Sequence, residues 1–186
     1  MPEIAETQYP AGFRAKDSQA LAKLLNQHHS VVLIGMKRVG ISGFLKFFIQ
    51  RYRAKNQFFV YIDLNDLIEL SRPAFWTLIL TRLVDNIQKS TLSEPVKRRC
   101  RRLFIQSIQL KDGFFTQESI RQILVEITAA GLLPVIFVNR FDRLKPAITR
   151  EFTSNLVGLY DFTHRHLVYV LTSFRPLPEL PSTLFK

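Results

Sequence analysis

The stretch from Ser30 to Ile49 constrains the fold of this chain more than any other part of the sequence. It begins with an uninterrupted aliphatic run at residues 31–34, which is typical of a parallel strand buried on both faces. From Ile41 onward, apolar residues recur at the spacing of an amphipathic helix, and they are Phe44, Leu45, Phe48 and Ile49. The stretch therefore predicts a strand, a short loop and a helix in direct succession.

The loop in this stretch is bracketed by two glycines. Gly35 and Gly40 enclose residues 36–39, which is the spacing of a P-loop, where backbone N–H groups and a helix N-terminus face a phosphate. The motif continues with Lys, which reaches the β- and γ-phosphates, and with Ser or Thr, which binds Mg²⁺. Here the pair is Ile41-Ser42. Because isoleucine has neither charge nor a donor, the site loses about 1.5–3 kcal/mol for each missing charged hydrogen bond.

The composition is that of one domain with a sizeable core. The chain has 186 residues, of which 47% are hydrophobic, and no apolar run approaches the roughly 20 residues of a membrane-spanning helix. We therefore expect a soluble, cytoplasmic protein, and the single cysteine, Cys100, excludes an internal disulfide framework. The net charge of +11 is spread through the chain and favours polyanionic surfaces, either nucleic acid or acidic lipid.

Apolar runs of strand length alternate with amphipathic patterns through the rest of the chain. Further strands are predicted at residues 58–64, 132–139 and 166–173, and helices at 17–25, 73–87, 94–110, 116–130 and 146–156. Asp17 or Ser18 is the expected N-cap of the first helix, Thr116 is the expected N-cap of a later one, and Pro146 is expected to open the last. Strands separated by helices predict an α/β fold, a three-layer sandwich around a mainly parallel sheet.

The densest charge block of the chain surrounds Cys100 and consists of Lys97, Arg98, Arg99, Arg101 and Arg102. Two interpretations fit this basic patch. One is a solvated helix face whose side-chain stems lie on apolar surface. The other is a contact surface for the phosphate backbone of a nucleic acid. The first is favoured, because no aromatic residues are interleaved to stack against bases.

The order of these segments resembles the AAA+ and STAND-type P-loop ATPases, in particular the archaeal and bacterial ATPases that are similar to replication initiators. Residues 12–17 are similar to the Gly-Arg-acidic segment ahead of the first strand in that family, and residues 37–40 match its Arg-rich phosphate loop. Residues 60–64 resemble its second strand, residues 137–144 its Walker B strand with the following turn, and residues 171–173 its sensor 1 position.

The resemblance also implies a domain organisation and a set of site residues. A P-loop NTPase-like domain is expected at residues 14–175, after a lead-in segment at 1–13 and before an irregular tail at 176–186, without the family's C-terminal helical lid. The residual nucleotide-binding residues are expected to be Gly35, Lys37, Arg38, Val39, Gly40, Ile41, Ser42 and Gly43. Ser173 takes the sensor-like position.

The departures from the family lie where it handles the γ-phosphate. In the family's Walker B segment an Asp orients Mg²⁺ and the next residue, Glu, activates water, whereas this chain has Asn139 and Arg140. Asn is a poorer partner for a hydrated dication, and Arg cannot act as a base because its guanidinium is not deprotonated in proteins. With Ile41, three such positions are replaced, while Ser42 and Ser173 keep their hydroxyls.

These replacements favour a degenerate domain that binds ATP or ADP weakly or not at all, without Mg²⁺ and without hydrolysis. We expect it to act as a regulatory or interaction module with a protein partner or a second copy of the chain. The alternatives are an active ATPase in which Lys37 and Asp142 replace the missing groups, a nucleic-acid-binding module built on the basic patch, and a glycine-bracketed turn that never meets phosphate. No metal site is predicted, because His28 and His29 have no second Cys or His cluster beside them.

Overall fold

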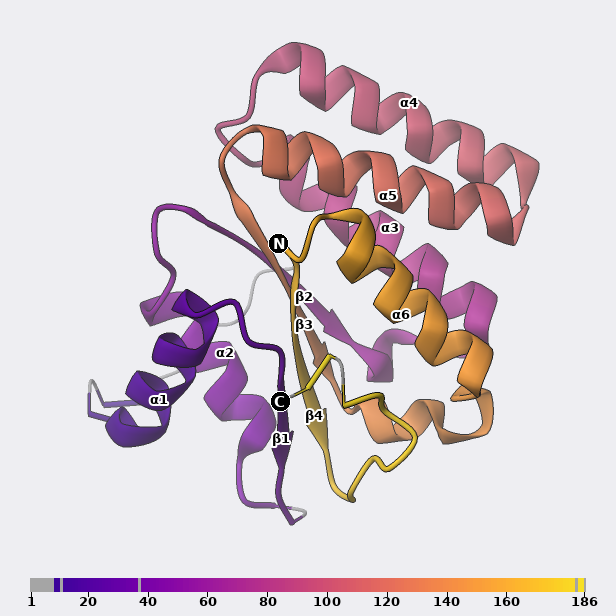
Figure 1. Cartoon of the computed structure of the whole chain (residues 1–186). Coiled ribbons are helices and arrows are strands. Elements are labelled where there is room, and N and C mark those ends of the chain that lie inside the picture. Colours follow the sequence, from indigo (N-terminus) through magenta and orange to yellow (C-terminus); the bar gives the residue numbers. More distant parts are fainter. Residues whose placement is uncertain (1–8, 11, 37, 183, 186) are drawn as a thin grey trace.

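The computed structural model describes residues 9–10, 12–36, 38–182 and 184–185 of the chain. Helices connect the strands, and three α-helices follow one another between the second and third strands (Figure 1). The strands are β1 (Val31–Ile34), β2 (Gln57–Asp63), β3 (Leu133–Asn139) and β4 (Val168–Ser173). The α-helices are α1 (Ala15–Asn26), α2 (Ile41–Arg51), α3 (Arg72–Gln88), α4 (Glu94–Leu110), α5 (Gly113–Ala129) and α6 (Arg150–Phe162). Two 3₁₀ helices follow β2 and β3, and they are η1 (Leu64–Asp66) and η2 (Phe141–Ala147).

The four strands form one parallel sheet in the order β1-β4-β3-β2. β3 and β4 lie in the centre and are buried along their whole length, as expected for parallel strands covered on both faces. The register pairs Asp63 with Asn139 at the carboxyl ends of β2 and β3, and Ile34 with Ser173 at the carboxyl ends of β1 and β4. The predicted α/β fold with a mainly parallel sheet is confirmed.

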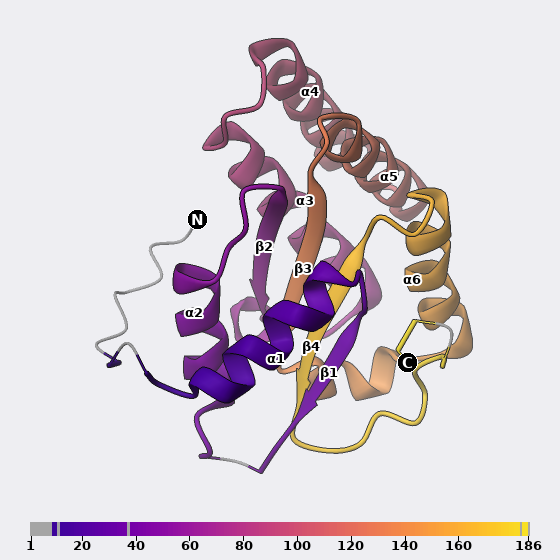
Figure 2. The same ribbon diagram turned by 60° about the vertical axis from the view of Figure 1, so that its left-hand side comes forward.

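Helices cover both faces of the sheet and make three layers (Figures 1 and 2). On one face, α1 and α2 bury Leu21, Leu25, Phe44 and Phe48 against Phe59, Phe137 and Val170 of the sheet. On the other face, α3, α5 and α6 pack against the alternate side chains of the same strands, including Val60, Ile136 and Tyr169. α4 packs on α3 and α5 and is the helix farthest from the sheet in Figure 1.

Two predicted helix starts in the second half of the chain are wrong, and local hydrogen bonds explain why. Thr116 is not an N-cap, because Asp112 caps α5 by accepting a hydrogen bond from Phe115 N at 2.8 Å, and the Thr116 hydroxyl instead lies 2.8 Å from that of Ser107. Pro146 does not open a helix, since it lies within η2, and α6 begins after Thr149, whose hydroxyl accepts from a backbone N–H of the first turn.

The first helix begins earlier than predicted, and two leucines after residue 176 are buried. α1 begins at Ala15, so Asp17 lies in its first turn and Ser18 is buried; neither residue is the N-cap. In the tail, Leu177 and Leu184 are 8% and 4% exposed and join the core on the α3–α6 side of the sheet. Within the described residues, no helix has the length and apolar character needed to span a membrane.

Candidate functional site

The candidate site lies at the carboxyl ends of the strands, where β1 turns into α2. β1 ends at Ile34, and α2 starts at Ile41 directly after Gly40, whose φ of +79° is the left-handed conformation that glycine adopts without strain. The strand, the loop and the helix therefore follow one another as the sequence predicts. Arg38 also has a positive φ, of +69°, and is exposed. Lys37 lies outside the described residues.

The loop is packed against itself by two aliphatic side chains. A Cβ at Gly35 would lie 2.5 Å from Cδ1 of Ile41 and 3.2 Å from Cγ2 of Val39, so a larger residue there would require the Ile41 side chain to move. Ile41 is 7% exposed. The side chain at the position of the family's lysine therefore folds back against the end of β1, where it contributes to the hydrophobic core instead of facing an anion.

Arg14 and Tyr9, which precede β1 in the sequence, contact the loop and α2. The Arg14 guanidinium donates a hydrogen bond to the carbonyl oxygen of Val39, and its Cζ lies 5.8 Å from the ring centroid of Phe44. The hydroxyl oxygen of Tyr9 occupies the space beside Gly43, because a Cβ there would lie 2.6 Å from it. Sequence reasoning placed both residues near the domain boundary and assigned neither to the site.

A hydrogen-bonded network joins α2 to three strand ends. The Ser42 hydroxyl donates to Oδ1 of Asn139 at 3.0 Å, and the Thr172 hydroxyl donates to the same oxygen at 2.9 Å. The Asn139 amide nitrogen donates to Oδ2 of Asp63 at 3.0 Å. Asn139 is 1% exposed, so its burial is compensated by these bonds. Each of the four side chains is satisfied by another protein group.

The network explains why a neutral amide suits position 139. An Asn side chain carries both an acceptor and a donor, and here it accepts from two hydroxyls and donates to a carboxylate. An ionised Asp at the same place would accept only, and would stand next to Asp63 with no donor between the two carboxylates. Asn139 is therefore the chemically complementary partner of Asp63.

Asp63 was missed at the sequence level, although it ends the apolar run 58–62. Parallel strands bring their carboxyl ends together at one edge of the sheet, and this was the available signal. Besides Asn139, Asp63 accepts from Asn65 N at 3.0 Å and from the Tyr61 hydroxyl at 3.2 Å. Burial, with the nearby charge of Asp63, raises the pKa of Tyr61, so its hydroxyl stays protonated and donates.

The side chains of Arg140 and Ser173 have partners outside the network, although the backbone N–H of Arg140 donates to the Thr172 hydroxyl at 2.8 Å. The Arg140 guanidinium lies 4.3 Å from the ring centroid of Phe174, and its Nε is 4.0 Å from Oδ1 of Asp142. The Ser173 hydroxyl donates to the Arg175 carbonyl oxygen and accepts from Arg175 N. The hydroxyl that faces Asn139 from the end of β4 is therefore that of Thr172, one residue earlier than the sequence comparison suggests.

The basic patch lies on α4, in the outermost layer and away from the phosphate-type loop (Figure 1). Lys97 pairs with Glu94 at 3.2 Å, and Arg99 pairs with Glu126 of α5 at 2.7 Å. The other members, Arg98, Arg101 and Arg102, are exposed. The structure thus does not bring the basic patch and the loop together.

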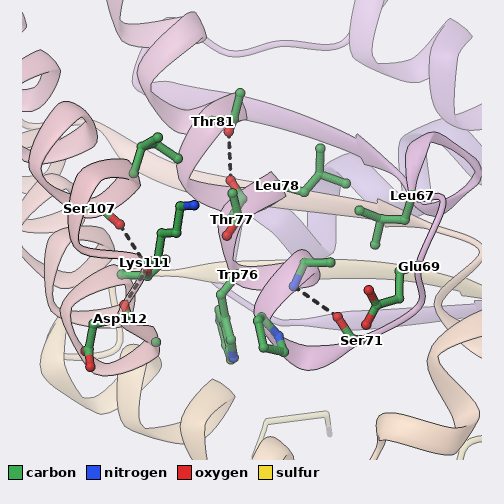
Figure 3. A pocket seen from close by; sticks show the side chains of 15 residues that line it. Leu67, Glu69, Ser71, Trp76, Thr77, Leu78, Thr81, Ser107, Lys111 and Asp112 are labelled. Atoms are coloured by element: carbon green, nitrogen blue, oxygen red, sulfur yellow. Dashed lines mark hydrogen bonds between the residues drawn. The ribbon is translucent and has the colours of Figure 1, made fainter.

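A groove of about 820 Å³ opens between α3, the segment after η1 and the turn from α4 to α5 (Figure 3). In Figure 3, Leu67 and Glu69 lie on one side of it, Ser107 and Lys111 lie on the other, and Trp76 lies between them in the lower part of the view. Its lining is mostly apolar, and none of the predicted site residues contributes to it.

Comparisons with known proteins show the fold. No family model matches the chain, and no curated protein is similar to it in sequence. Among solved structures, the chain is similar to the Walker-type ATPase PABY2304 of Pyrococcus abyssi, with a TM-score of 0.55 and 17% identity over 87% of this chain and 45% of that one. It is also similar to the ORC2 protein of Aeropyrum pernix, solved in ADPNP and ADP complexes, with a TM-score of 0.58 and 13% identity over 91% and 43% of the two chains. The chain therefore shares its fold with part of each of these proteins and spans less than half the length of either.

Proposed function

We propose that this chain is a degenerate P-loop ATPase-like domain that binds ATP or ADP weakly or not at all, does not hydrolyse it, and acts as a regulatory or interaction module. The observation that carries the proposal is the network around Asn139, because it uses the polar groups that a nucleotide-bound metal would need. The similarity to ATPases supports the fold, and the network supports the loss of metal-dependent ATP binding and hydrolysis.

The residues at the network do not fit Mg²⁺. This cation prefers carboxylate, phosphate and water oxygens in near-octahedral geometry. The Ser42 hydroxyl is bonded to a neutral amide, and the carboxylate of Asp63 already accepts from Asn139, Tyr61 and Asn65. A metal ion would have to break these hydrogen bonds before gaining a ligand.

The side chains that would stabilise the γ-phosphate or activate water are also absent or directed elsewhere. Ile41 is buried against Gly35, and the Arg140 guanidinium lies over the Phe174 ring with its Nε 4.0 Å from Asp142. Because Arg140 lies beside Asp142, this carboxylate is a poor replacement for the missing acid. Losing such groups costs several powers of ten in rate.

Residual phosphate binding has a physical basis in the helix start. Among the described residues no side chain caps the N-terminus of α2, so no side chain competes with an anion for the N–H groups of its first turn, and Arg38 is exposed in the loop before it. Weak binding that needs no metal is therefore expected, and Lys37 is predicted to add to it.

Calorimetric titration with ATP, with and without Mg²⁺, tests the proposal. We expect either no measurable binding or a dissociation constant of about 0.1 mM or weaker, equal in both conditions. Micromolar binding that requires Mg²⁺ would contradict the proposal. Phosphate release that is lost in Lys37→Ala and in Asp142→Asn would instead support the active ATPase.

A variant with the motif residues restored tests whether these side chains alone account for the proposed loss of Mg²⁺-dependent ATP binding. Ile41→Lys with Asn139→Asp returns the charged groups of the family's motif to a scaffold that keeps Ser42 in place. We expect Mg²⁺-dependent ATP binding at least about tenfold tighter than in the unmodified chain. The matched control is the same pair with Ser42→Ala, which removes the hydroxyl and should abolish the gain.

A further inference from the structure

The parallel sheet has two edge strands, and they differ in how far they are covered. Strand β2 is buried from residue 57 to residue 62. In β1, at the other edge, Val31, Val32 and Leu33 are only half-buried, and Ile34 is 54% exposed. In Figure 2, β1 lies at the border of the sheet beside β4. The β1 edge is therefore accessible from outside the domain.

The outer backbone groups of β1 have no hydrogen-bond partner among the described residues. Successive residues of a strand turn their N–H and C=O groups to opposite sides. The Gly35 N–H donates to the Ser173 carbonyl oxygen at 3.2 Å, so the backbone of Leu33, two residues earlier, also faces β4. The backbones of Val32 and Ile34 therefore face outward, and no described group bonds to them. They form a row of positive N–H and negative C=O partial charges.

The side chains of β1 do not protect this edge. Exposed edges of soluble proteins usually carry a lysine, a proline or a bulge that prevents further strand pairing. The sequence of β1 is VVLI, and its register with β4 is continuous, so it has none of these features. A groove of about 410 Å³ lies beside the strand, and its lining includes residues 31–34, Leu21 and Leu24 of α1, and Phe44 of α2. An apolar edge with an adjoining groove is a surface to which another strand can be added.

We propose that the β1 edge pairs with the β1 edge of a second copy of this chain, in the antiparallel direction about a two-fold axis at Leu33. Such a contact uses the same surface on both copies and closes as a dimer. It joins the two four-stranded sheets into one continuous sheet. The inference gives a surface and a partner to the interaction role in the proposed function and rests on that role, but it does not depend on whether ATP binds.

The edge is complementary to itself in charge and in register. In an antiparallel pair centred on Leu33, Val32 of each copy stands opposite Ile34 of the other, and these are the residues whose backbones face outward. Two residues per copy, with one N–H and one C=O each, form four hydrogen bonds and leave none of their outward groups unpaired. All the facing side chains are aliphatic, so no like charges meet across the strands although each copy has a net charge of +11.

The side chains on both faces of the sheet also fit this arrangement. Val32 packs against the core on the α3–α6 side, and by strand alternation Ile34 points to the same side, where Val32 of the second copy covers it. Leu33 packs on the α1–α2 side, where Leu33 of the second copy lies opposite and enters the groove. Any extended strand offers backbone groups, whereas the second copy offers a matching register and matching side chains as well.

Sedimentation velocity of the full chain tests the proposal, in about 0.3 M salt to screen the net charge of each copy. We expect a monomer–dimer equilibrium between about 1 and 200 µM. Ile34→Lys places a charge at the edge, and Ile34→Pro removes an outward N–H without removing a bond to β4; each should weaken association at least about tenfold. The matched control, Ile68→Lys, makes the same change at a fully exposed isoleucine outside β1 and should leave the dissociation constant unchanged.

Cross-linking tests the register of the pair. Facing residues of antiparallel strands that are not hydrogen-bonded to each other have Cα atoms about 4.5 Å apart, within the span of a disulfide. Leu33→Cys should therefore form a disulfide-linked dimer under mild oxidation, whereas Ile68→Cys should not. The native Cys100 is fully buried and does not interfere.

A chain that stays monomeric up to about 200 µM, equal dissociation constants for Ile34→Lys and Ile68→Lys, or no disulfide in Leu33→Cys would each overturn the proposal. A monomer in which the Val32 and Ile34 amides resist hydrogen exchange would do so as well, because another segment would then cover the edge. Titration of the unmodified chain with ATP keeps the two proposals apart. A chain that dimerises through β1 and also binds ATP with Mg²⁺ would contradict only the proposed loss of nucleotide binding.

Discussion

The polar groups at the carboxyl end of the sheet and those on the outer face of α4 are used in opposite ways. At the sheet, Asn139 is buried and joins Ser42, Thr172 and Asp63, so these four side chains are satisfied inside the protein. On α4, the charges of Arg98, Arg101 and Arg102 face solvent. The P-loop-like turn lies at the first region, whereas the three arginines of the second have no ionic partner among the described residues.

The two regions therefore differ in role. The buried hydrogen bonds stabilise the domain, whereas the exposed cations are available to bind anions. Buried hydrogen bonds are costly to break, because the partners that remain lose their compensation. Exposed cations contribute little to stability and remain available to anions. Substitutions in the first region should therefore change the free energy of unfolding, and substitutions in the second should change binding only.

The largest expected effect follows from removing the centre of the network. Asn139→Leu, which is similar in size, leaves Ser42, Thr172 and Asp63 without their shared partner and should lower the free energy of unfolding by about 3–5 kcal/mol. Urea unfolding measures this loss. Arg102→Leu is the matched control on α4 and should change stability by less than about 0.5 kcal/mol. Equal effects of the two substitutions would remove the contrast between the regions.

The next effect concerns the inner side of α4. Burial, together with the charge of Glu126, raises the pKa of the Cys100 thiol to about 11. Because the thiolate is the reactive form, a thiol reagent at pH 8 should react roughly 100-fold more slowly with the folded chain than with the chain in urea. Rapid labelling of the native protein would show that α4 is not packed as described.

Asn139→Asp should destabilise the domain in a pH-dependent way. The introduced carboxyl stands beside Asp63, and the like charge raises its pKa in the folded state above the unfolded value, so the variant is relatively stable at acidic pH. Its deficit should appear as the pH rises above about 4 and reach about 1–3 kcal/mol at pH 7. Thermal unfolding between pH 4 and 7 measures it, and a deficit that does not change with pH would mean that the two carboxylates do not interact.

The smallest effect is expected on α4. Replacing Arg98, Arg101 and Arg102 together by Gln removes three charges that have no described partner, so the free energy of unfolding should change by less than about 0.5 kcal/mol. Urea unfolding in parallel with the Asn139 variants provides the comparison. A loss above about 2 kcal/mol would mean that these arginines stabilise the fold and are not free to bind.

The sequence predicted the scaffold well because buried strands and amphipathic helices leave strong periodic signals. The run at 31–34 and the glycines around the loop led directly to β1 and α2. Helix starts were less predictable, because Asp112 and Thr149 cap through single hydrogen bonds that other polar residues nearby could equally make.

The network was only partly predictable from the chain. Ser42 and Asn139 were singled out by motif spacing, and the fold brings them to 3.0 Å. Asp63 and Thr172 belong to the network because of the register of β2 and β4 against β3. Neighbouring residues of a strand point to opposite faces of the sheet, so a register shift of one residue would turn these side chains away. This is why Ser173, adjacent in sequence, faces Arg175 instead.

The most direct test of the account is paramagnetic broadening by Mn²⁺, which takes the oxygen ligands that Mg²⁺ prefers. In the presence of ATP, we expect the side-chain amide resonance of Asn139 and the backbone amide of Ser42 to keep their line widths, because neither group is released to a metal. Selective broadening of both resonances at substoichiometric Mn²⁺ would contradict the claim that hydrogen bonds have replaced the metal site.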